Sequence, residues 1–230
     1  MNPKESSTTL SAFGTCPEKI RQLDLGVQAK HDRLQASLSV FHNRIDDYIL
    51  IQSAFSKHAL MGAGTRLATI SRNVDVTTWG GEAAMSYLLD RHWRAEGSVA
   101  YVRGDNDTDH TALVQITPLQ ARLGLRWEIG AWSAGGTLRM VAAQNRVDPD
   151  KGNIVGQDIG PTGGFSTVSM NIGYKRVAGV ALFAGVDNLF DRSYAEHISR
   201  SGASIPGFER TRRINEPGRI LWLRAQVALD

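Results

Sequence analysis

Cysteine is nearly absent from this 230-residue chain, and so are several other features that would assign a class. The single cysteine, Cys16, excludes an internal disulfide framework or a cysteine-based zinc site, and we interpret it as a free thiol in a loop. No run of about eighteen apolar residues predicts a membrane-spanning helix. The net charge of +3 is spread along the sequence, so no nucleic-acid partner is expected. Residues Met1–Ser7 lack the apolar segment of a signal peptide, and we expect no export signal there.

Alternation of apolar and polar residues is what the sequence has in abundance. From Ala121 to Ile129 every second residue is apolar, and the pattern resumes at Trp132 after the turn Gly130-Ala131. A period of two predicts β-strands with one apolar and one polar face. The polar face of this hairpin carries the charges of Arg122, Arg126, Glu128 and Arg139, which we interpret as solvated or paired charges facing a lumen.

About nine strands are predicted in this way. Their approximate ranges are 21–30, 34–48, 70–89, 93–103, 119–129, 132–142, 167–174, 180–190 and 220–229. Short turns alternate with long connections, the latter predicted at 53–66, 104–118, 145–164 and 191–217. This layout is typical of an antiparallel transmembrane β-barrel with short periplasmic turns and long extracellular loops. A soluble sandwich has no reason to gather every long loop at one end.

Acidic residues in two of these loops were tested against the calcium pattern. Asp105, Asp107 and Asp109 occupy the first, third and fifth positions of an EF-hand loop, but His110 stands where glycine is required and Ile116 where glutamate is required. The motif therefore fails, and we interpret this segment as a solvated loop. The same interpretation applies to three further aspartates, Asp148, Asp150 and Asp158.

Metal and catalytic sites are not predicted. The six histidines are scattered without ligand spacing; His197, beside Glu196, is the one best placed to touch a ligand arriving from outside. Met61 lies in a loop and Met140 on the apolar face, so neither is expected to bind copper. There is no Gly-x-Ser-x-Gly motif, and 160–164 does not match a phosphate-binding loop. We therefore expect no enzyme, no cofactor and no high-affinity copper site in this chain.

A family resemblance rests on the carboxyl-terminal third. Residues Gly185–Tyr194 read Gly-Val-Asp-Asn-Leu-Phe-Asp-Arg-Ser-Tyr, and Glu216–Arg219 read Glu-Pro-Gly-Arg before a final alternating strand. This resembles the end of a TonB-dependent outer-membrane receptor, in which an Asn-Leu-Phe-Asp run closes the penultimate strand and Pro-Gly-Arg opens the last. Stretches similar to the copper-receptor subgroup are 73–75 with 79–82, 103–106, 152–156 and 194–200. The resemblance covers nearly everything from Pro17 to Arg224.

The resemblance implies a fragment of a larger barrel. Such receptors have about twenty-two strands, a plug domain and a short box that binds TonB, whereas about nine strands are predicted here. Residues 1–16 would be an irregular segment from an extracellular loop of the parent barrel, and residues 17–230 the carboxyl-terminal part of the barrel. The subgroup's sulfur ligands lie in the plug and the earlier barrel, and no position here matches them. The last residues, Ala228-Leu229-Asp230, lack the terminal aromatic that barrel assembly uses.

The implied partners are outer-membrane lipid, the rest of the barrel and plug, and TonB through regions outside this chain. The parent receptor would take up copper or a metal chelate in a bacterial outer membrane, and the fragment would not transport alone. Two other classes remain as alternatives: a soluble β-sheet domain that binds a ligand or partner, and a β-barrel enzyme. An odd strand count makes the first and last strands run the same way, so we expect an open curved sheet or a parallel seam.

Overall fold

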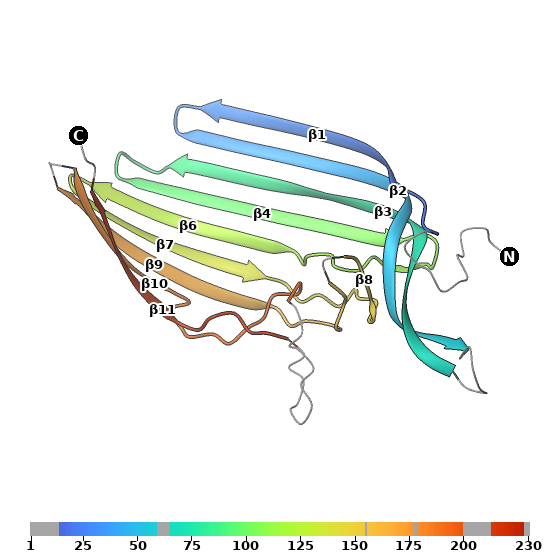
Figure 1. The fold of residues 1–230 in the computed structure, drawn as a ribbon. Helices are drawn as coiled ribbons and strands as arrows, with labels where there is room; N and C mark the ends of the chain where they lie inside the picture. The colour runs from blue at the N-terminus through green and yellow to red at the C-terminus, as the bar shows by residue number, and fades with distance from the viewer. Residues whose placement is uncertain (1–13, 59–64, 155, 177–178, 200–212, 228–230) are drawn as a thin grey trace, which may run out of the picture.

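The structure is a computed structural model that describes residues 14–58, 65–154, 156–176, 179–199 and 213–227, and these form one curved antiparallel sheet (Figure 1). Nine long strands follow one another in chain order across it: β1 (Lys19–His31), β2 (Leu34–His58), β3 (Thr65–Leu88), β4 (Trp93–Asn106), β6 (Gln120–Ile129), β7 (Trp132–Val141), β9 (Phe165–Arg176), β10 (Val180–Asp187) and β11 (Ile220–Val227). Two short strands, β5 (Thr111–Ala112) and β8 (Lys151–Gly152), pair with β4 and β2. The described part holds no helix long and apolar enough to span a membrane.

The predicted strands are all present, but the predicted loop at 53–66 is wrong. β2 continues to His58 and β3 begins at Thr65, so most of that range is strand, and the pair extends beyond the rest of the sheet (Figure 1). Register shifts between Ile45 and Tyr48, and again between Gln52 and Phe55, mark β-bulges. Asp47, inside the first bulge, has a φ of 63°. Each bulge inserts one extra residue into β2, which reverses the side-chain alternation and hides the strand from a periodicity search.

The concave face of the sheet is polar, as the alternation predicts. A hollow of about 830 Å³ crosses β1 to β7 and is lined by side chains such as Gln28, Ser37, Ser98, Arg122 and Thr137. The strand register places Arg139 opposite Arg122 on the same face, and Arg126 follows Arg122 by four residues, an even number, in β6. On β11, Arg224 lies over the ring of Phe183, its partner in β10. The predicted inward facing of these four arginines follows from this register.

The convex face is apolar and exposed. Leu221 and Leu223 are each 79% exposed, and Leu25 is 62% exposed, although a soluble sheet would cover such a face. Further exposed members are Leu23, Val27, Leu38, Val40, Met85, Val99, Leu123, Leu125, Met170, Ile172 and Leu182. Aromatic pairs border this face. At the short-turn end Trp93 lies 6.4 Å from Trp127 and Trp132 lies 4.7 Å from Tyr174, and at the loop end Trp79 lies 5.5 Å from Tyr101, measured between ring centroids.

The sheet is open, which confirms one of the two predicted outcomes. β1 and β11 are its edges, and each pairs with a single neighbour among the described residues (Figure 1). Because every neighbouring pair of the nine strands is antiparallel, β1 and β11 run in the same direction. An antiparallel seam between them is therefore impossible.

The carboxyl-terminal motifs meet in space. Asn188, which is 5% exposed with a φ of 51°, donates from its side-chain amide to the backbone oxygen of Arg192 at 2.9 Å and to that of Pro217 at 3.5 Å. The Asp191 carboxylate accepts the backbone N–H of Arg219 at 2.8 Å. A Cβ on Gly218 would lie 2.5 Å from that carboxylate, so a larger residue there would displace the Asp191 side chain. The Asn-Leu-Phe-Asp and Pro-Gly-Arg runs thus form one junction between β10 and β11.

Candidate functional site

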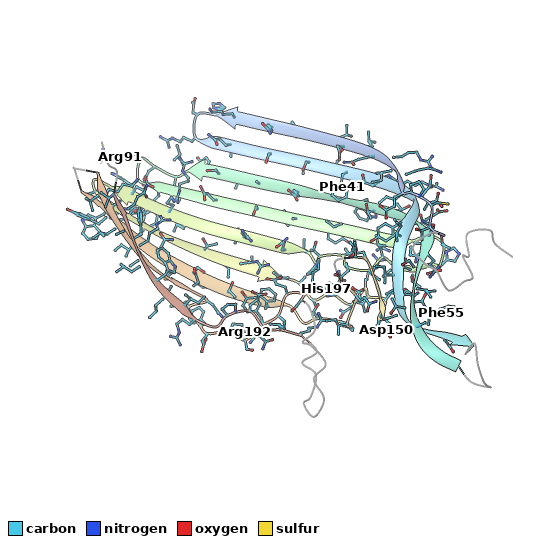
Figure 2. All side chains as sticks on the ribbon, in the orientation of Figure 1. Phe41, Phe55, Arg91, Asp150, Arg192 and His197 are labelled. Carbon is cyan, nitrogen blue, oxygen red and sulfur yellow. The ribbon has the colours of Figure 1, made fainter. Side chains whose placement is uncertain are left out.

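The long connections gather at one end of the sheet, which we call the loop end, opposite the short turns. Figure 2 places Asp150, His197 and Phe55 at this end and Arg91 at the other. A small apolar core made of Leu50, Val74, Val76, Leu113 and Val114 holds the loops against β2 and β3. The buried side chain of Asn73 clamps the chain before β1: it accepts the backbone N–H of Cys16 at 2.7 Å and donates to the Cys16 oxygen at 3.0 Å.

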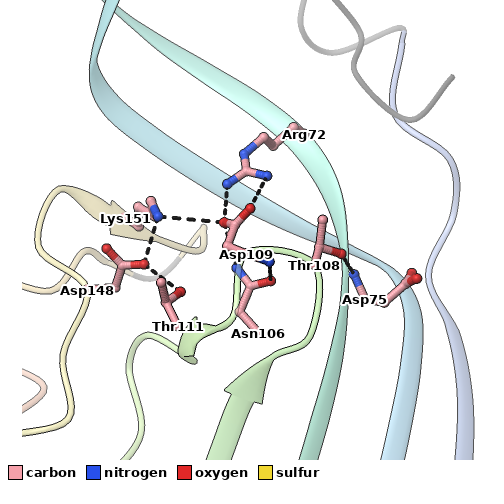
Figure 3. Close-up of polar contacts among 8 residues, drawn as sticks. All are labelled: Arg72, Asp75, Asn106, Thr108, Asp109, Thr111, Asp148 and Lys151. Atoms are coloured by element: carbon pink, nitrogen blue, oxygen red, sulfur yellow. Dashed lines mark hydrogen bonds and ion pairs between the residues drawn. The ribbon is translucent and has the colours of Figure 1, made fainter. Parts of the chain in front are cut away.

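Asp109 is the centre of a charged network between three segments of the loop end (Figure 3). It forms a two-pronged pair with Arg72 of β3, one arm of which is 3.0 Å long. It also accepts from the amide of Asn106 at 2.9 Å and lies 3.6 Å from the Lys151 ammonium. Lys151 continues the network to Asp148 at 2.7 Å. Burial alone would raise the pKa of Asp109, but Arg72 and Lys151 hold it below its ordinary value.

The predicted solvated character of these aspartates is wrong for the buried Asp158 and fits the exposed Asp107 and Asp150. Asp105 is paired with Arg103 and Arg146, Asp107 accepts from the Thr77 hydroxyl at 2.7 Å, and Asp109 is bound as above. Three further aspartates, Asp148, Asp150 and Asp158, are held by ion pairs or backbone bonds. Arg103 and Lys151 are sequence neighbours of the aspartates that they pair with, Asp105 and Asp148. Arg72 and Arg146 come from distant segments that no local pattern in the sequence could have revealed.

His197 is buried, contrary to its predicted contact with a ligand from outside. It is 5% exposed, which is incompatible with contact to a ligand arriving from outside. Its Nδ1 lies 2.8 Å from the Thr162 hydroxyl, and its Nε2 is buried 3.8 Å from the Asp158 carboxylate. Asp158 accepts from the backbone and side chain of Gln115 and from the backbone N–H of Asp148. Burial lowers the pKa of His197, which keeps its imidazole neutral.

Arg213, which the sequence did not single out, completes this junction. It donates to the backbone oxygen of His197 at 3.0 Å and to the backbone oxygen of Gly160. The connection between β10 and β11 is thereby joined to the connection between β7 and β9. The described parts of these two connections are therefore fastened to each other.

Glu196 fastens the same connection to the concave wall. It forms a two-pronged pair with Arg139 of β7, with arms of 2.5 and 3.2 Å. Arg139 also lies over the Phe165 ring, which stacks on Tyr194 with centroids 4.1 Å apart. The paired charge predicted for Arg139 is confirmed, and its partner comes from a loop. A hollow of about 370 Å³ beside this pair is lined by Arg122, Thr167, Ser169 and Asp187.

The described residues of the loop end form no metal-binding group. No group of three or more His, Cys, Asp or Glu that could hold a metal occurs within the described segments. Met140 lies on the convex face, with partners Ala121 and Ser166 on the neighbouring strands, as predicted; Met61 lies outside the described residues. Cys16 is exposed and free. The arrangement can bind polar or charged molecules through fixed cations and hydrogen bonds along a curved wall.

Residues 9–189 match the family model described as TonB dependent receptor-like, beta-barrel. A solved structure titled "Copper transporter OprC" is 42% identical with a TM-score of 0.83, and the match covers 92% of this chain and 31% of that one. No curated protein sequence matches.

Two further solved structures share the fold at lower identity. A ferric enterobactin receptor from Pseudomonas aeruginosa is 21% identical with a TM-score of 0.70, covering 93% of this chain and 31% of that one. The siderophore receptor PirA from Acinetobacter baumannii is 19% identical with a TM-score of 0.64, covering 93% and 32%. The chain thus spans about a third of the length of each relative. These relatives are transport receptors rather than enzymes, and the family is one of outer-membrane proteins. The open sheet, its apolar convex face and its polar concave wall are those of a barrel segment, and the chain belongs to the TonB-dependent receptor family as part of its β-barrel.

Proposed function

We propose that this chain forms the carboxyl-terminal part of the barrel of a bacterial outer-membrane receptor that takes up copper or a metal chelate. The observation that carries this is the 42% identity, spread over 92% of the chain, to a copper transporter. The receptors of ferric chelates among the relatives are 21% identical or less, so their likeness supports the fold and not the ligand.

The loops and the concave wall would have different roles in such a receptor. The fastened loops at the loop end would capture the ligand outside, and the polar concave wall would face the plug and the path inward. Energy for release would come through TonB acting on the plug, in regions that this chain does not supply. We therefore propose that the isolated chain does not transport and that further strands pair with the open edges of β1 and β11.

The soluble alternative is disfavoured by the convex face. Leu221 and Leu223, both 79% exposed, are among many apolar side chains that water would meet directly. Lipid would cover this face, and the aromatic pairs would lie at its two borders. A chain that is monodisperse in buffer without detergent would contradict the membrane proposal.

Copper uptake by cells tests the proposed ligand. Bacteria that express the receptor containing this segment would accumulate copper faster than cells in which the gene is deleted, as measured by elemental mass spectrometry. Loss of TonB should abolish the difference. The same cells supplied with a ferric catecholate provide the second arm, and TonB-dependent accumulation of iron without copper would replace the copper proposal with a chelate one.

A further inference from the structure

His197 and Asp158 are buried side by side where the β10–β11 connection meets the β7–β9 connection (Figure 2). Their side chains are 2% and 1% exposed, and 3.8 Å separates His197 Nε2 from the nearer carboxylate oxygen. That gap is too long for a hydrogen bond, and Nε2 has no other partner among the described residues. The Thr162 hydroxyl holds the other ring nitrogen, Nδ1, at 2.8 Å. The imidazole is therefore fixed in place with one nitrogen unsatisfied.

Asp158 is held away from that nitrogen by its other bonds. One carboxylate oxygen accepts from the backbone N–H and the side-chain amide of Gln115, at 3.0 and 3.1 Å. The second oxygen accepts from the backbone N–H of Asp148 at 3.1 Å. These three donors already stabilise the negative charge in a site without solvent access. A proton on His197 Nε2 would therefore add a buried positive charge without gaining a short hydrogen bond.

The junction already contains a cation for its buried carboxylate. The Arg213 guanidinium donates to the backbone oxygens of His197 and Gly160, and Asp158 attracts it. A protonated His197 would be a second cation at this place, repelled by Arg213. Burial and Arg213 together outweigh the attraction of Asp158, so the pKa of His197 lies below its ordinary value.

Two further carboxylates adjoin the junction, but each has its own cation. Asp148 lies 2.7 Å from the Lys151 ammonium, and Glu196, the residue before His197, forms its two-pronged pair with Arg139. A proton on His197 would therefore find no second carboxylate to balance it among the described residues.

The contacts of His197, Thr162 and Arg213 join the two connections, and we call these three residues the latch. The β10–β11 connection also lines the hollow of about 370 Å³ on the concave wall, through Tyr194 and Pro217. It has a second attachment to that wall in the Glu196 pair. Separation at the latch alone would therefore free one side of the connection and leave the other side attached.

We propose that the latch is operated by acid, and that protonation of His197 releases the β10–β11 connection from the β7–β9 connection. The neutral imidazole keeps the two connections joined at neutral pH. A protonated imidazole reaches water only when it leaves Thr162 and Asp158, so acid favours the open form. Tyr194 and Pro217 would then be free to move away from the hollow. Because the pKa of the latched imidazole lies below the ordinary 6.5, opening should increase by up to tenfold per pH unit below 6.5, until the latched imidazole is itself protonated.

Hydrogen exchange of the chain folded in detergent micelles, measured by mass spectrometry between pH 7.5 and 5.0, tests this proposal. The reporters are peptides that contain Thr162 and Glu216, whose backbone N–H groups are both hydrogen-bonded to backbone oxygens. Dividing each rate by the intrinsic exchange rate at that pH gives a protection factor. The test variant is H197Q. The matched control is H31Q, because His31 is an exposed histidine at the short turn between β1 and β2.

The wild type and H31Q should lose protection at both reporters by up to tenfold per pH unit below 6.5, and H197Q should not. A second measurement covers a variant whose latch is open at every pH. In the wild type, NMR titration of the His197 imidazole should give a midpoint below 6.5, at the pH where the loss of protection levels off.

Protection that is unchanged or higher in acid would overturn the proposal, because the pair with Asp158 would then tighten on protonation. The same acid dependence in H197Q as in H31Q would also overturn it, as would an imidazole midpoint at or above 6.5. Neither measurement involves copper or uptake, so the outcome is independent of the ligand that the receptor carries.

Discussion

Replacing Leu123 by arginine tests the facing of the whole sheet, because this residue lies at the centre of the convex face. Trp93 and Tyr101 mark the two borders of that face on β4 and are eight residues apart, a distance of about 26 Å along the strand. With a strand tilt of about 40° they span about 20 Å of depth, near the roughly 25 Å band of a barrel. Gly97, midway between them, pairs with Leu123, which is 52% exposed.

The cost of arginine depends steeply on depth. At the bilayer midplane it is about 2–4 kcal/mol, and near the interface about 0–1 kcal/mol. Ile129, on the same face and strand, lies six residues nearer the short turn and provides the interfacial control. Thr137 provides the concave control, since it lines the polar hollow beside Arg122. L123R should therefore lose about 2–4 kcal/mol of unfolding free energy, and I129R and T137R about 0–1 kcal/mol.

Guanidinium titration of the chain in lysophospholipid micelles, followed by tryptophan fluorescence, measures these differences. Micelles provide an apolar interior that can cover the convex face. Equal losses in L123R and T137R would refute the assignment of the two faces. A loss in I129R as large as that in L123R would refute the depth argument while leaving the facing intact.

Four further predictions concern the loops, the metal and the edges. D109N leaves Arg72 and Lys151 without their shared carboxylate, so it should lower the free energy of unfolding by about 1–3 kcal/mol and speed hydrogen exchange in residues 104–118. Because the pKa of Asp109 is lowered in the folded state, its contribution to stability is complete above its ordinary pKa of 3.8 and is lost as pH falls through the folded value. The pKa of His197 is also lowered, so its contribution is complete above 6.5 and declines as pH falls from there toward the folded value; thermal unfolding of H197Q should show a weaker acid dependence, and an unchanged one would contradict the burial argument. Copper(I) titration should detect no tight stoichiometric site, and one that disappears on changing Met61 or His197 would refute this. Heated gel shifts should show no heat-resistant form of the chain alone in vesicles, because β1 and β11 cannot close antiparallel; such a form without a parallel seam would show that the strand count is wrong.

The sequence predicted strands where apolar and polar side chains alternate and did not predict structure where they do not. Strands such as β6 and β7 could be predicted because Leu123 lies on the apolar face and Arg122 on the polar face, and this alternation repeats every second residue. β2 beyond Tyr48 could not, because the bulge at Asp47 shifts the alternation and an apolar run follows.

The pairings at the loop end lay beyond sequence reasoning. Arg72 and Asp109 are 37 residues apart, and Arg139 and Glu196 are 57 apart. Such contacts depend on strand register and on loop packing, and neither leaves a local pattern. His197 illustrates the error that results: its position in a long loop indicated exposure, whereas Thr162, Asp158 and Arg213 enclose it.

The bulge at Asp47 fixes the number of residues that β2 must have at this point, so related genes should preserve that number. Deleting this one residue would let β2 continue in strict alternation and would turn the following segment over, moving Leu50 from the buried core at the loop end to the outer face. A second deletion near the bulge between Gln52 and Phe55 would be needed to restore the far end of the strand. Related genes should therefore keep the spacing at these positions, and losses of single codons here should occur in pairs.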